Sequence, residues 1–228
     1  MKKAFIVFIA LAGIYALLLA KPELYFGKSF AYKGFTVRAH GELPVQIEAR
    51  LDGAYEKIAV SELFKENSSF ELIVPSSRGE FVFFTPLQKG EFSRVNPFHG
   101  AIFLAAADFK EGEVRTAPGG AQKRRLSSEI AGAAARELSR RLFKPLSYLF
   151  RDDWEIRGYA AHIAGLTGEF SPPDACSAAS TTDLEDYRHG LMVETIMKED
   201  NIGFKELINR NTSFETAEDR MKKAHCGG

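Results

Sequence analysis

An excess of one sign of charge, long basic runs and internal repeats each indicate a particular class of protein, and this chain has none of the three. Neither sign of charge predominates, because 30 lysines and arginines face 30 aspartates and glutamates. Long runs of lysine and arginine are also missing, and phosphate binding normally needs a basic surface. We therefore expect no nucleic acid partner. The chain also lacks internal repeats, and its 228 residues, 45% of them hydrophobic, are enough for one globular domain with its own core.

Charged residues are absent from residues 4–20. Two lysines precede this segment and a Lys-Pro pair ends it, a pattern typical of a signal peptide or an N-terminal membrane anchor. A cut after Ala20 would put Leu18 at the −3 position, where a small residue is preferred, so we favour an uncleaved anchor. Both interpretations divide the chain into residues 1–20 and a domain of residues 21–228. Both place that domain outside the cytoplasm, anchored to a bacterial-type inner membrane, periplasmic or secreted.

Cysteine occurs only twice, at Cys176 and Cys226. In an oxidising compartment two cysteines pair more often than they catalyse. We therefore expect one disulfide that holds the C-terminal tail to the loop around Cys176. The alternative is a nucleophilic Cys176 with a histidine partner.

The apolar patterns predict an α+β fold, in which an N-terminal apolar helix precedes a small mixed sheet and a mostly helical C-terminal part. The predicted strands are 30–38, 69–74 and 100–109, and 80–84 is either a strand or part of a short helix. The predicted helices are 44–60, 126–143, 154–165, 184–198, 204–208 and 216–223. Glycine and proline place loops at 111–123 and 167–182.

The helix predicted at 126–143 has two distinct faces. Leucine, isoleucine and alanine recur at helical spacing and form one buried stripe. At about 100° per residue, a second face lies away from that stripe. This face carries Gly132, Ala133, Arg136 and Arg140, with Glu129 beside them. Close backbone packing at the small residues, with solvated arginines, is its simplest explanation.

The order of motifs around this helix is a more specific signal of a protein family than the two faces of the helix. It reads L-S-S-x-I-A, five residues, then L-x-x-R-L-F-x-P-L-x-Y-L, a tryptophan and G-Y-A-x-x-I-A-G. This order resembles the core of bacterial peptidase MA-like domains, which are zincin-like metallopeptidases of the gluzincin group. There the five residues are H-E-x-x-H, and the later segment is W-x-x-E-G-Y-A. The histidines bind zinc, the glutamate between them activates the metal-bound water, and the later glutamate is the third ligand.

This chain departs from that family at all four chemical positions, which are Gly132, Ala133, Arg136 and Arg157. Glycine and alanine offer no ligand atom, and arginine is a permanent cation that donates no lone pair to a metal. The resemblance therefore implies the scaffold without its zinc. We expect no metal, no cofactor and no zincin-type hydrolysis.

Two arginines directed into the vacated metal position would need compensating negative charge. Glu129 is the favoured internal partner, because it shares a helix face with Arg136. The other internal candidates are Glu137, Asp152, Asp153 and Glu155. The external alternative is a carboxylate or phosphate ligand held by Arg136, Arg157 and Arg140.

Three functions follow from these observations. The first is a non-catalytic zincin-like domain, exported or membrane-tethered, that binds a peptide, protein or anionic ligand. In the family the strand before the site helix, here 100–109, borders the cleft and can accept an extended peptide as a further strand. The second is a purely structural or assembly role of the same fold. The third is a hydrolase that uses Cys176 or Ser128 with a histidine, although no G-x-S-x-G motif supports it. The five histidines show no ligand spacing, which leaves a displaced metal site as a weaker alternative.

Overall fold

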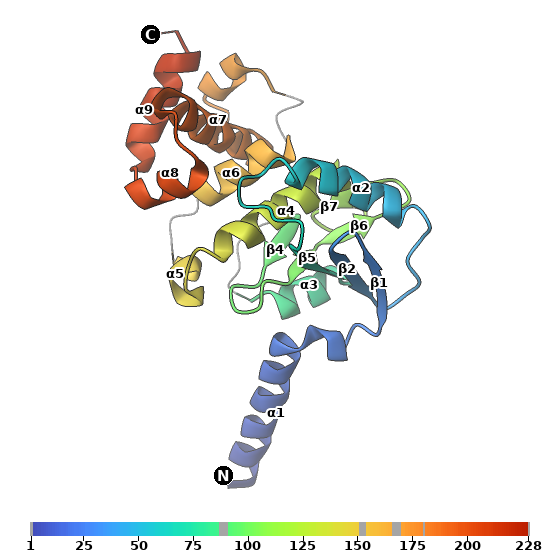
Figure 1. Ribbon diagram of the computed structural model, residues 1–228. Helices are drawn as coiled ribbons and strands as arrows, with labels where there is room; N and C mark the ends of the chain where they lie inside the picture. Colours follow the sequence, from blue (N-terminus) through green and yellow to red (C-terminus); the bar gives the residue numbers. More distant parts are fainter. Residues whose placement is uncertain (1, 87–90, 151–153, 166–169, 180, 228) are drawn as a thin grey trace.

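A five-stranded sheet organises the first half of the chain, and helices make up most of the second half (Figure 1). The computed structural model describes residues 2–86, 91–150, 154–165, 170–179 and 181–227. The strands are β1 Lys28–Tyr32, β2 Phe35–Ala39, β3 Phe70–Val74, β4 Ser93–Val95, β5 Ile102–Leu104, β6 Ala106–Asp108, β7 Glu113–Arg115 and β8 Lys123–Arg125. The α+β class expected from the sequence is confirmed.

The predicted helices are present with differences at their ends, and three short helical segments, 22–24, 145–150 and 172–176, were not predicted. The helices are α1 Lys2–Ala20, η1 Pro22–Leu24, α2 Ile47–Ile58, α3 Arg78–Phe84, α4 Leu126–Arg140, α5 Pro145–Phe150, α6 Trp154–Ala164, η3 Pro172–Cys176, α7 Thr182–Asp200, α8 Phe204–Arg210 and α9 Phe214–His225. The ambiguous segment 80–84 is therefore helical, and the Ser77 side chain caps α3 by accepting a hydrogen bond from the Glu80 N–H.

The strand predicted at 30–38 is a hairpin of two strands, β1 and β2. The two-residue turn is Lys33 and Gly34, both with positive φ (44° and 80°), which suits the right-handed twist of the flanking strands. A Cβ on Gly34 would lie 2.6 Å from the carbonyl oxygen of Ser68, so a larger residue there would collide with the backbone. The alternating pattern runs through this turn, which explains why sequence periodicity alone predicts one strand.

The strand predicted at 100–109 is also divided, because β5 and β6 belong to different sheets. The large sheet has the order β1-β2-β3-β5-β4, with β2, β3 and β5 parallel and β1 and β4 antiparallel at the edges. β5 is therefore not the edge strand expected for this segment, since β4 pairs with it, whereas β6 lies at the edge of the small sheet. The predicted loop 111–123 includes β7, which joins β6 and β8 in a small antiparallel sheet.

Side chains of the central strands alternate between two apolar clusters. Leu72 and Ile102 face the larger one with α2 and α4, whereas Ile73 and Phe103 face a smaller one with α3 and Phe26. This alternation follows from the pleat of the strands, which sends successive side chains to opposite faces. The sheet therefore lies between two layers of helix (Figure 1).

Helix α4 is the centre of the larger cluster and packs against α2, α6 and the sheet edge. Most of its residues are buried, including the alanines on both sides of the predicted stripe. One buried stripe was predicted, but the structure encloses the helix on nearly every side. Small side chains at its other positions make this possible, because they let α6 approach closely.

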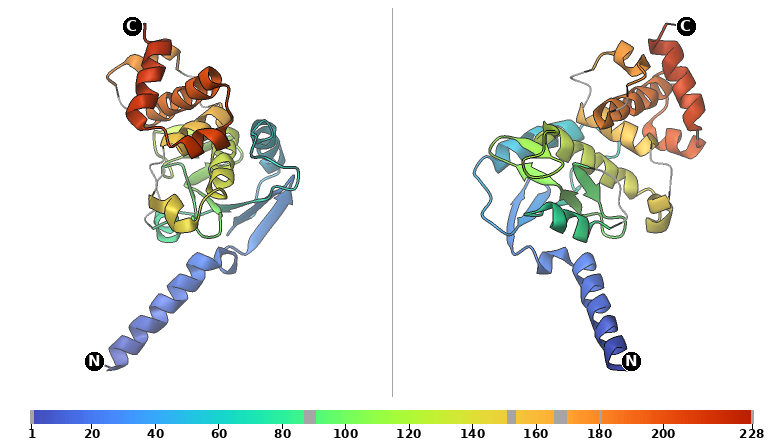
Figure 2. Two further views of the ribbon diagram at one scale, coloured as in Figure 1. Left: turned by 60° about the vertical axis from the view of Figure 1, so that its left-hand side comes forward. Right: turned by 180° about the vertical axis from the view of Figure 1, so that it is seen from behind.

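Helices α6 and α7 cross at two glycines. A Cβ on Gly158 of α6 would collide with the carbonyl oxygen of His189 and lie 2.7 Å from its carbonyl carbon, and Gly190 of α7 faces the Gly158 carbonyl oxygen. Such close contact between backbones needs residues without side chains. The C-terminal helices α8 and α9 then pack against α7, as Figure 2 shows from two further directions.

The Gly158→Ala variant is expected to lose about 1–3 kcal/mol of unfolding free energy, because the added methyl group overpacks this crossing. Denaturant unfolding followed by circular dichroism measures the loss. Gly79→Ala is the matched control, since Gly79 is also helical but its Cβ would meet nothing closer than the Ser77 Oγ at 3.8 Å. Equal stability of the two variants would show that α6 and α7 can move apart at this crossing without loss of stability.

Helix α1 projects from the end of the domain that carries α3 and α5 (Figures 1 and 2). Its described side chains are mostly exposed and apolar, among them Phe5, Phe8 and Leu11. Among the residues whose placement the structure describes, no helix meets the length and hydropathy needed to cross a membrane.

Candidate functional site

Gly132 and Ala133, which stand where the family has its first histidine and its glutamate, lie inside the protein. Ala133 is fully buried, and a Cβ on Gly132 would lie 3.3 Å from the Ala164 Cβ and 3.4 Å from the Ala160 carbonyl oxygen. Both of those atoms belong to α6. The two helices are therefore in contact where a zincin-like site would need room for two larger side chains.

Arg136, at the second histidine position, is bound to groups from two elements. Its Nη2 lies 2.9 Å from Oε1 of Glu129, about two turns earlier on α4. The same nitrogen donates a hydrogen bond to the Ser93 hydroxyl of β4, and that hydroxyl donates to the Glu129 carboxylate. Glu129 is only 2% exposed, so these contacts form inside the protein at the end of the sheet. The partner predicted for Arg136 is the one it has.

Arg124, at the end of the small sheet, continues the chain of charges. Its Nη1 lies 3.0 Å from Oε2 of Glu129, and its Nη2 lies 2.7 Å from Oδ2 of Asp186 on α7. It also pairs with Asp183, and its guanidinium stacks 4.4 Å above the ring of Phe92. A planar guanidinium with several donors suits this position, because it can bind carboxylates on two sides and still stack on a ring.

Arg157, at the third-ligand position, binds Asp186 at the other end of this series of ion pairs. Its Nη2 and Nε lie 2.7 and 3.1 Å from Oδ1 of Asp186. Arg136 and Arg157 are therefore connected through Glu129, Arg124 and Asp186, and they bind different carboxylates. We call these five residues the ion-pair network. It links α4, α6, α7 and the small sheet.

The three arginines of the network are compensated by Glu129, Asp186 and Asp183, and Glu185 also lies 4.0 Å from Arg157. Burial by itself raises the pKa of the Glu129 carboxyl, but Arg136 and Arg124 lower it by more, and the net shift is downward. The pKa of Asp186 is lowered in the same way, by Arg124 and Arg157 against the effect of burial. Both carboxyl groups are therefore ionised at neutral pH, and the network is composed of fully charged partners.

The other charged residues considered from the sequence serve elsewhere. Arg140 pairs with Glu137 at 2.5 Å, and Glu137 also binds Arg141 at 3.0 Å. Glu155 is buried at the start of α6. Asp152 and Asp153 lie outside the described residues. The three arginines proposed as an anion site, Arg136, Arg157 and Arg140, thus each have a carboxylate partner within the chain.

Sequence reasoning missed Arg124 and Asp186, the two residues that join the network. They are 62 positions apart, and neither lies on the helix face that the motif identifies. The only local signal is that Asp186 lies between apolar residues of α7 that are buried, where an unpaired carboxylate would be costly.

Other chemistry considered from the sequence finds no support in the geometry. Cys176 forms a disulfide with Cys226, which removes it as a thiolate nucleophile. Ser128 is buried within α4. Over the part of the chain that the structure describes, histidine, cysteine, aspartate and glutamate form no group of three that could hold a metal ion. The residues at the zincin-like positions do not fit zinc, since none of them has a donor atom for it.

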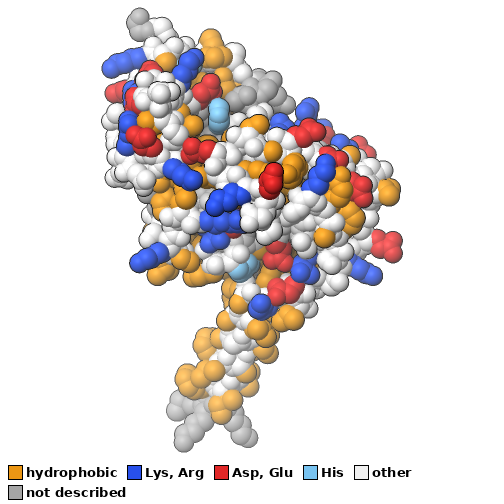
Figure 3. All heavy atoms as spheres, in the orientation of Figure 1, with side chains coloured by type: hydrophobic (Ala, Val, Ile, Leu, Met, Phe, Trp, Pro, Cys, Tyr) orange, Lys and Arg blue, Asp and Glu red, His pale blue; other side chains and the backbone are white. Residues whose placement is uncertain are grey.

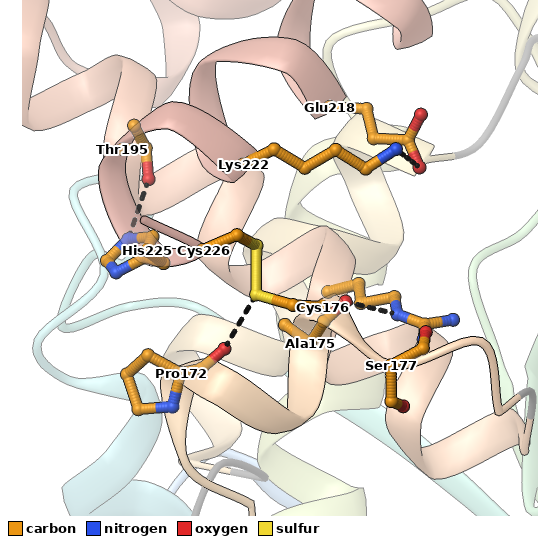
Figure 4. Close-up of a disulfide and its surroundings, with 10 residues drawn as sticks. Pro172, Ala175, Cys176, Ser177, Thr195, Glu218, Lys222, His225 and Cys226 are labelled. Carbon is orange, nitrogen blue, oxygen red and sulfur yellow. Dashed lines mark hydrogen bonds and ion pairs between the residues drawn. A yellow bond between two sulfur atoms is a disulfide. The ribbon is translucent and has the colours of Figure 1, made fainter. Parts of the chain in front are cut away.

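The disulfide connects the end of η3 to the residue after α9, with the two Cα atoms 5.7 Å apart (Figure 4). Close to it, Thr195 of α7 and His225 of α9 form a hydrogen bond of 3.2 Å. The covalent bond holds the last helix to η3, and this hydrogen bond holds it against α7. The C-terminal tail is thus held to the loop around Cys176, as expected from the sequence.

No family model, curated protein or solved structure matches this chain.

Proposed function

We propose that this chain is a non-catalytic zincin-like domain, tethered outside the cytoplasm through residues 1–20, that binds a peptide or protein partner. The observation that carries the proposal is the ion-pair network. It places paired arginines at two of the zincin-like positions, while Gly132 and Ala133 at the other two pack against α6. A Lewis acid and a general base are the groups that such hydrolysis needs, and these positions supply neither.

The internal pairing also selects among the possible ligands. A free phosphate or carboxylate would have to displace Glu129 or Asp186, each already bound by two arginines. A peptide that binds through its backbone faces no such competition. The peptide or protein form of the proposal is therefore favoured over the anionic ligand.

An edge of the large sheet gives a peptide a place to bind. The outer edge of β1 has no partner strand among the described residues. Tyr32 and Phe35 close the two-residue turn as a hydrogen-bonded pair, so the backbone groups of Ser29 and Ala31 point away from β2. Edges of this kind accept extended peptides as additional strands.

A structural or assembly role is the second candidate function. It is favoured by the tight contact of α4 with α6 at Gly132, because a closed site cannot receive a ligand between these helices. Under this alternative the network serves only to fix the helices, and the edge of β1 binds no peptide.

A displayed library of extended peptides, selected on the purified full chain, tests the proposal. We expect peptides that bind the natural chain and lose at least about tenfold in affinity with Ala31→Pro, which removes an outward N–H. Ala31→Val is the matched control, because it keeps the N–H and favours a strand. The same preparation, purified without chelator, is expected to hold no stoichiometric zinc.

Two results would contradict the proposal. Stoichiometric zinc, with peptide hydrolysis that a chelator abolishes, would show that a working metal site exists elsewhere in the chain. Failure of any peptide to bind, with the fold intact by circular dichroism, would favour the assembly role. Rebuilding H-E-x-x-H is a poor test, because a histidine side chain at position 132 would collide with α6.

A further inference from the structure

The last turns of α1 are built into the domain. Leu18 and Leu19 pack on the smaller apolar cluster that includes Phe26 and Phe103. The ring of Tyr15 lies 4.8 Å from that of Phe83 on α3, and its hydroxyl donates to the Phe83 carbonyl oxygen. Cleavage after Ala20 would remove these contacts and uncover part of that cluster. The packing therefore favours a mature chain that keeps α1.

Apolar side chains are exposed on the same end of the domain. Figures 1 and 2 place α3 and α5 on the side from which α1 emerges. Exposed side chains on this side come from η1, α3, the turn before β5, and α5 with the residues before it. They are Leu24, Val82, Phe83, Phe98, Leu142, Leu146 and Phe150, and we call them the apolar end. Phe98 is 64% exposed and Phe150 is 81% exposed, which would be costly if water were their final environment.

The apolar end is continuous with α1. Space-filling Figure 3 shows hydrophobic side chains along α1 and around the point where it joins the domain. Two exposed lysines flank these surfaces, Lys21 directly after α1 and Lys144 directly before α5. Aromatic and aliphatic side chains bordered by lysine suit the boundary between lipid headgroups and acyl chains.

We propose that α1 and the apolar end contact a lipid bilayer together, with the apolar end in the headgroup region, so that the domain is held against the membrane in one orientation. This inference rests on the tether of the proposed function, but not on its peptide binding. A second copy of the chain or a protein partner could also cover this surface. The bilayer is favoured over both because the apolar end adjoins α1, and α1 in the membrane would bring the apolar end to the bilayer surface. Lys21 and Lys144 add attraction to anionic headgroups.

Fluorescence quenching by lipids with brominated acyl chains tests this orientation. The full chain is reconstituted in vesicles of phosphatidylcholine and phosphatidylglycerol, with its N-terminus verified by mass spectrometry. Tryptophan is introduced by Phe98→Trp or Phe150→Trp, and the buried native Trp154 supplies the baseline. We expect the added emission to fall to about half, because interfacial side chains reach the acyl boundary. Omitting phosphatidylglycerol separates the contribution of anionic headgroups from that of the apolar contact.

Val45→Trp is the matched control. Val45 is 89% exposed and precedes α2, which lies far from α1 in Figure 1, so its emission should match the unquenched baseline. Quenching of Phe98→Trp and Phe150→Trp no greater than this control would overturn the proposal, as would loss of α1 from the mature chain. Burial of both introduced tryptophans by self-association of the chain, without quenching by the brominated lipids, would also overturn it. None of these outcomes depends on zinc content or peptide binding.

Discussion

Glu129→Gln is expected to lower the free energy of unfolding by about 3–5 kcal/mol, the largest effect of any single substitution proposed for this chain. Glu129 is 2% exposed and lies between Arg124 and Arg136 at 3.0 and 2.9 Å. Glutamine keeps the shape and removes the charge, so two buried guanidinium groups lose their shared partner. Denaturant unfolding of the full chain in detergent micelles measures the loss.

An exposed pair provides the matched control. Glu206→Gln removes one of two carboxylate partners of Arg210, whose side chain is 42% exposed, and we expect a change of at most about 0.5 kcal/mol. Adding Arg136→Met to Glu129→Gln should restore part of the lost stability, because it removes the cation that has lost its carboxylate partner. If Glu129→Gln costs no more than Glu206→Gln, the network does not hold α4 in place.

The network also makes a specific contribution to acid sensitivity. The folded pKa values of Glu129 and Asp186 lie below their ordinary values. A carboxyl group of this kind stabilises the fold fully above its unfolded pKa, and this stability is lost as pH falls through the folded pKa. The natural chain should therefore lose stability as pH falls below about 4.5, the range of unfolded carboxyl groups. Glu129→Gln should show a shallower slope there.

Removing the disulfide is expected to cost about 2–4 kcal/mol. The bond closes a loop with a sequence separation of 50 residues, and opening that loop gives the unfolded chain more conformational freedom. Cys176→Ser combined with Cys226→Ser avoids a free thiol that could form bonds between chains. The midpoint of denaturant unfolding, measured for the natural chain and the double variant, reports the cost.

Reductant provides the internal control for this effect. The natural chain should fall to the stability of the double variant when reductant is added, whereas the double variant should not respond. We expect the loss to be greatest around α9, which the disulfide and the hydrogen bond of His225 to Thr195 hold in place. Hydrogen exchange measured by segment tests this location. A natural chain that is insensitive to reductant would show that α7 and α9 stay together without the covalent bond.

The chain shows clearly which structural features are determined locally. Helix α2 has buried residues at Ile47, Leu51, Ala54 and Ile58, a spacing that defines a helix before any partner is known. The hairpin of β1 and β2 was missed although its Lys33-Gly34 turn is a local signal, because the alternation of side chains continues through the turn. The presence of only two cysteines was sufficient to suggest their pairing.

The candidate site shows the opposite case. The pairing of Arg136 with Glu129 could be predicted, because the two residues lie on one face of one helix. The partners of Arg157 and the closure of the site could not. Arg124 and Asp186 meet only because α7 folds back across α6 at Gly158 and Gly190, and nothing in local periodicity encodes that contact.

The sequence by itself determined the longer helices, strand β3 and the residue types at Gly132, Ala133, Arg136 and Arg157, none of which is a zinc ligand, because these depend on residue identity and short-range spacing. Only the tertiary structure decided how the segments 30–38 and 100–109 divide into strands, where β4, β7 and β8 pair, and which charges surround Arg136 and Arg157. Buried charges take whichever opposite charges the packing of distant elements brings near, and the cost of leaving them unpaired selects that arrangement.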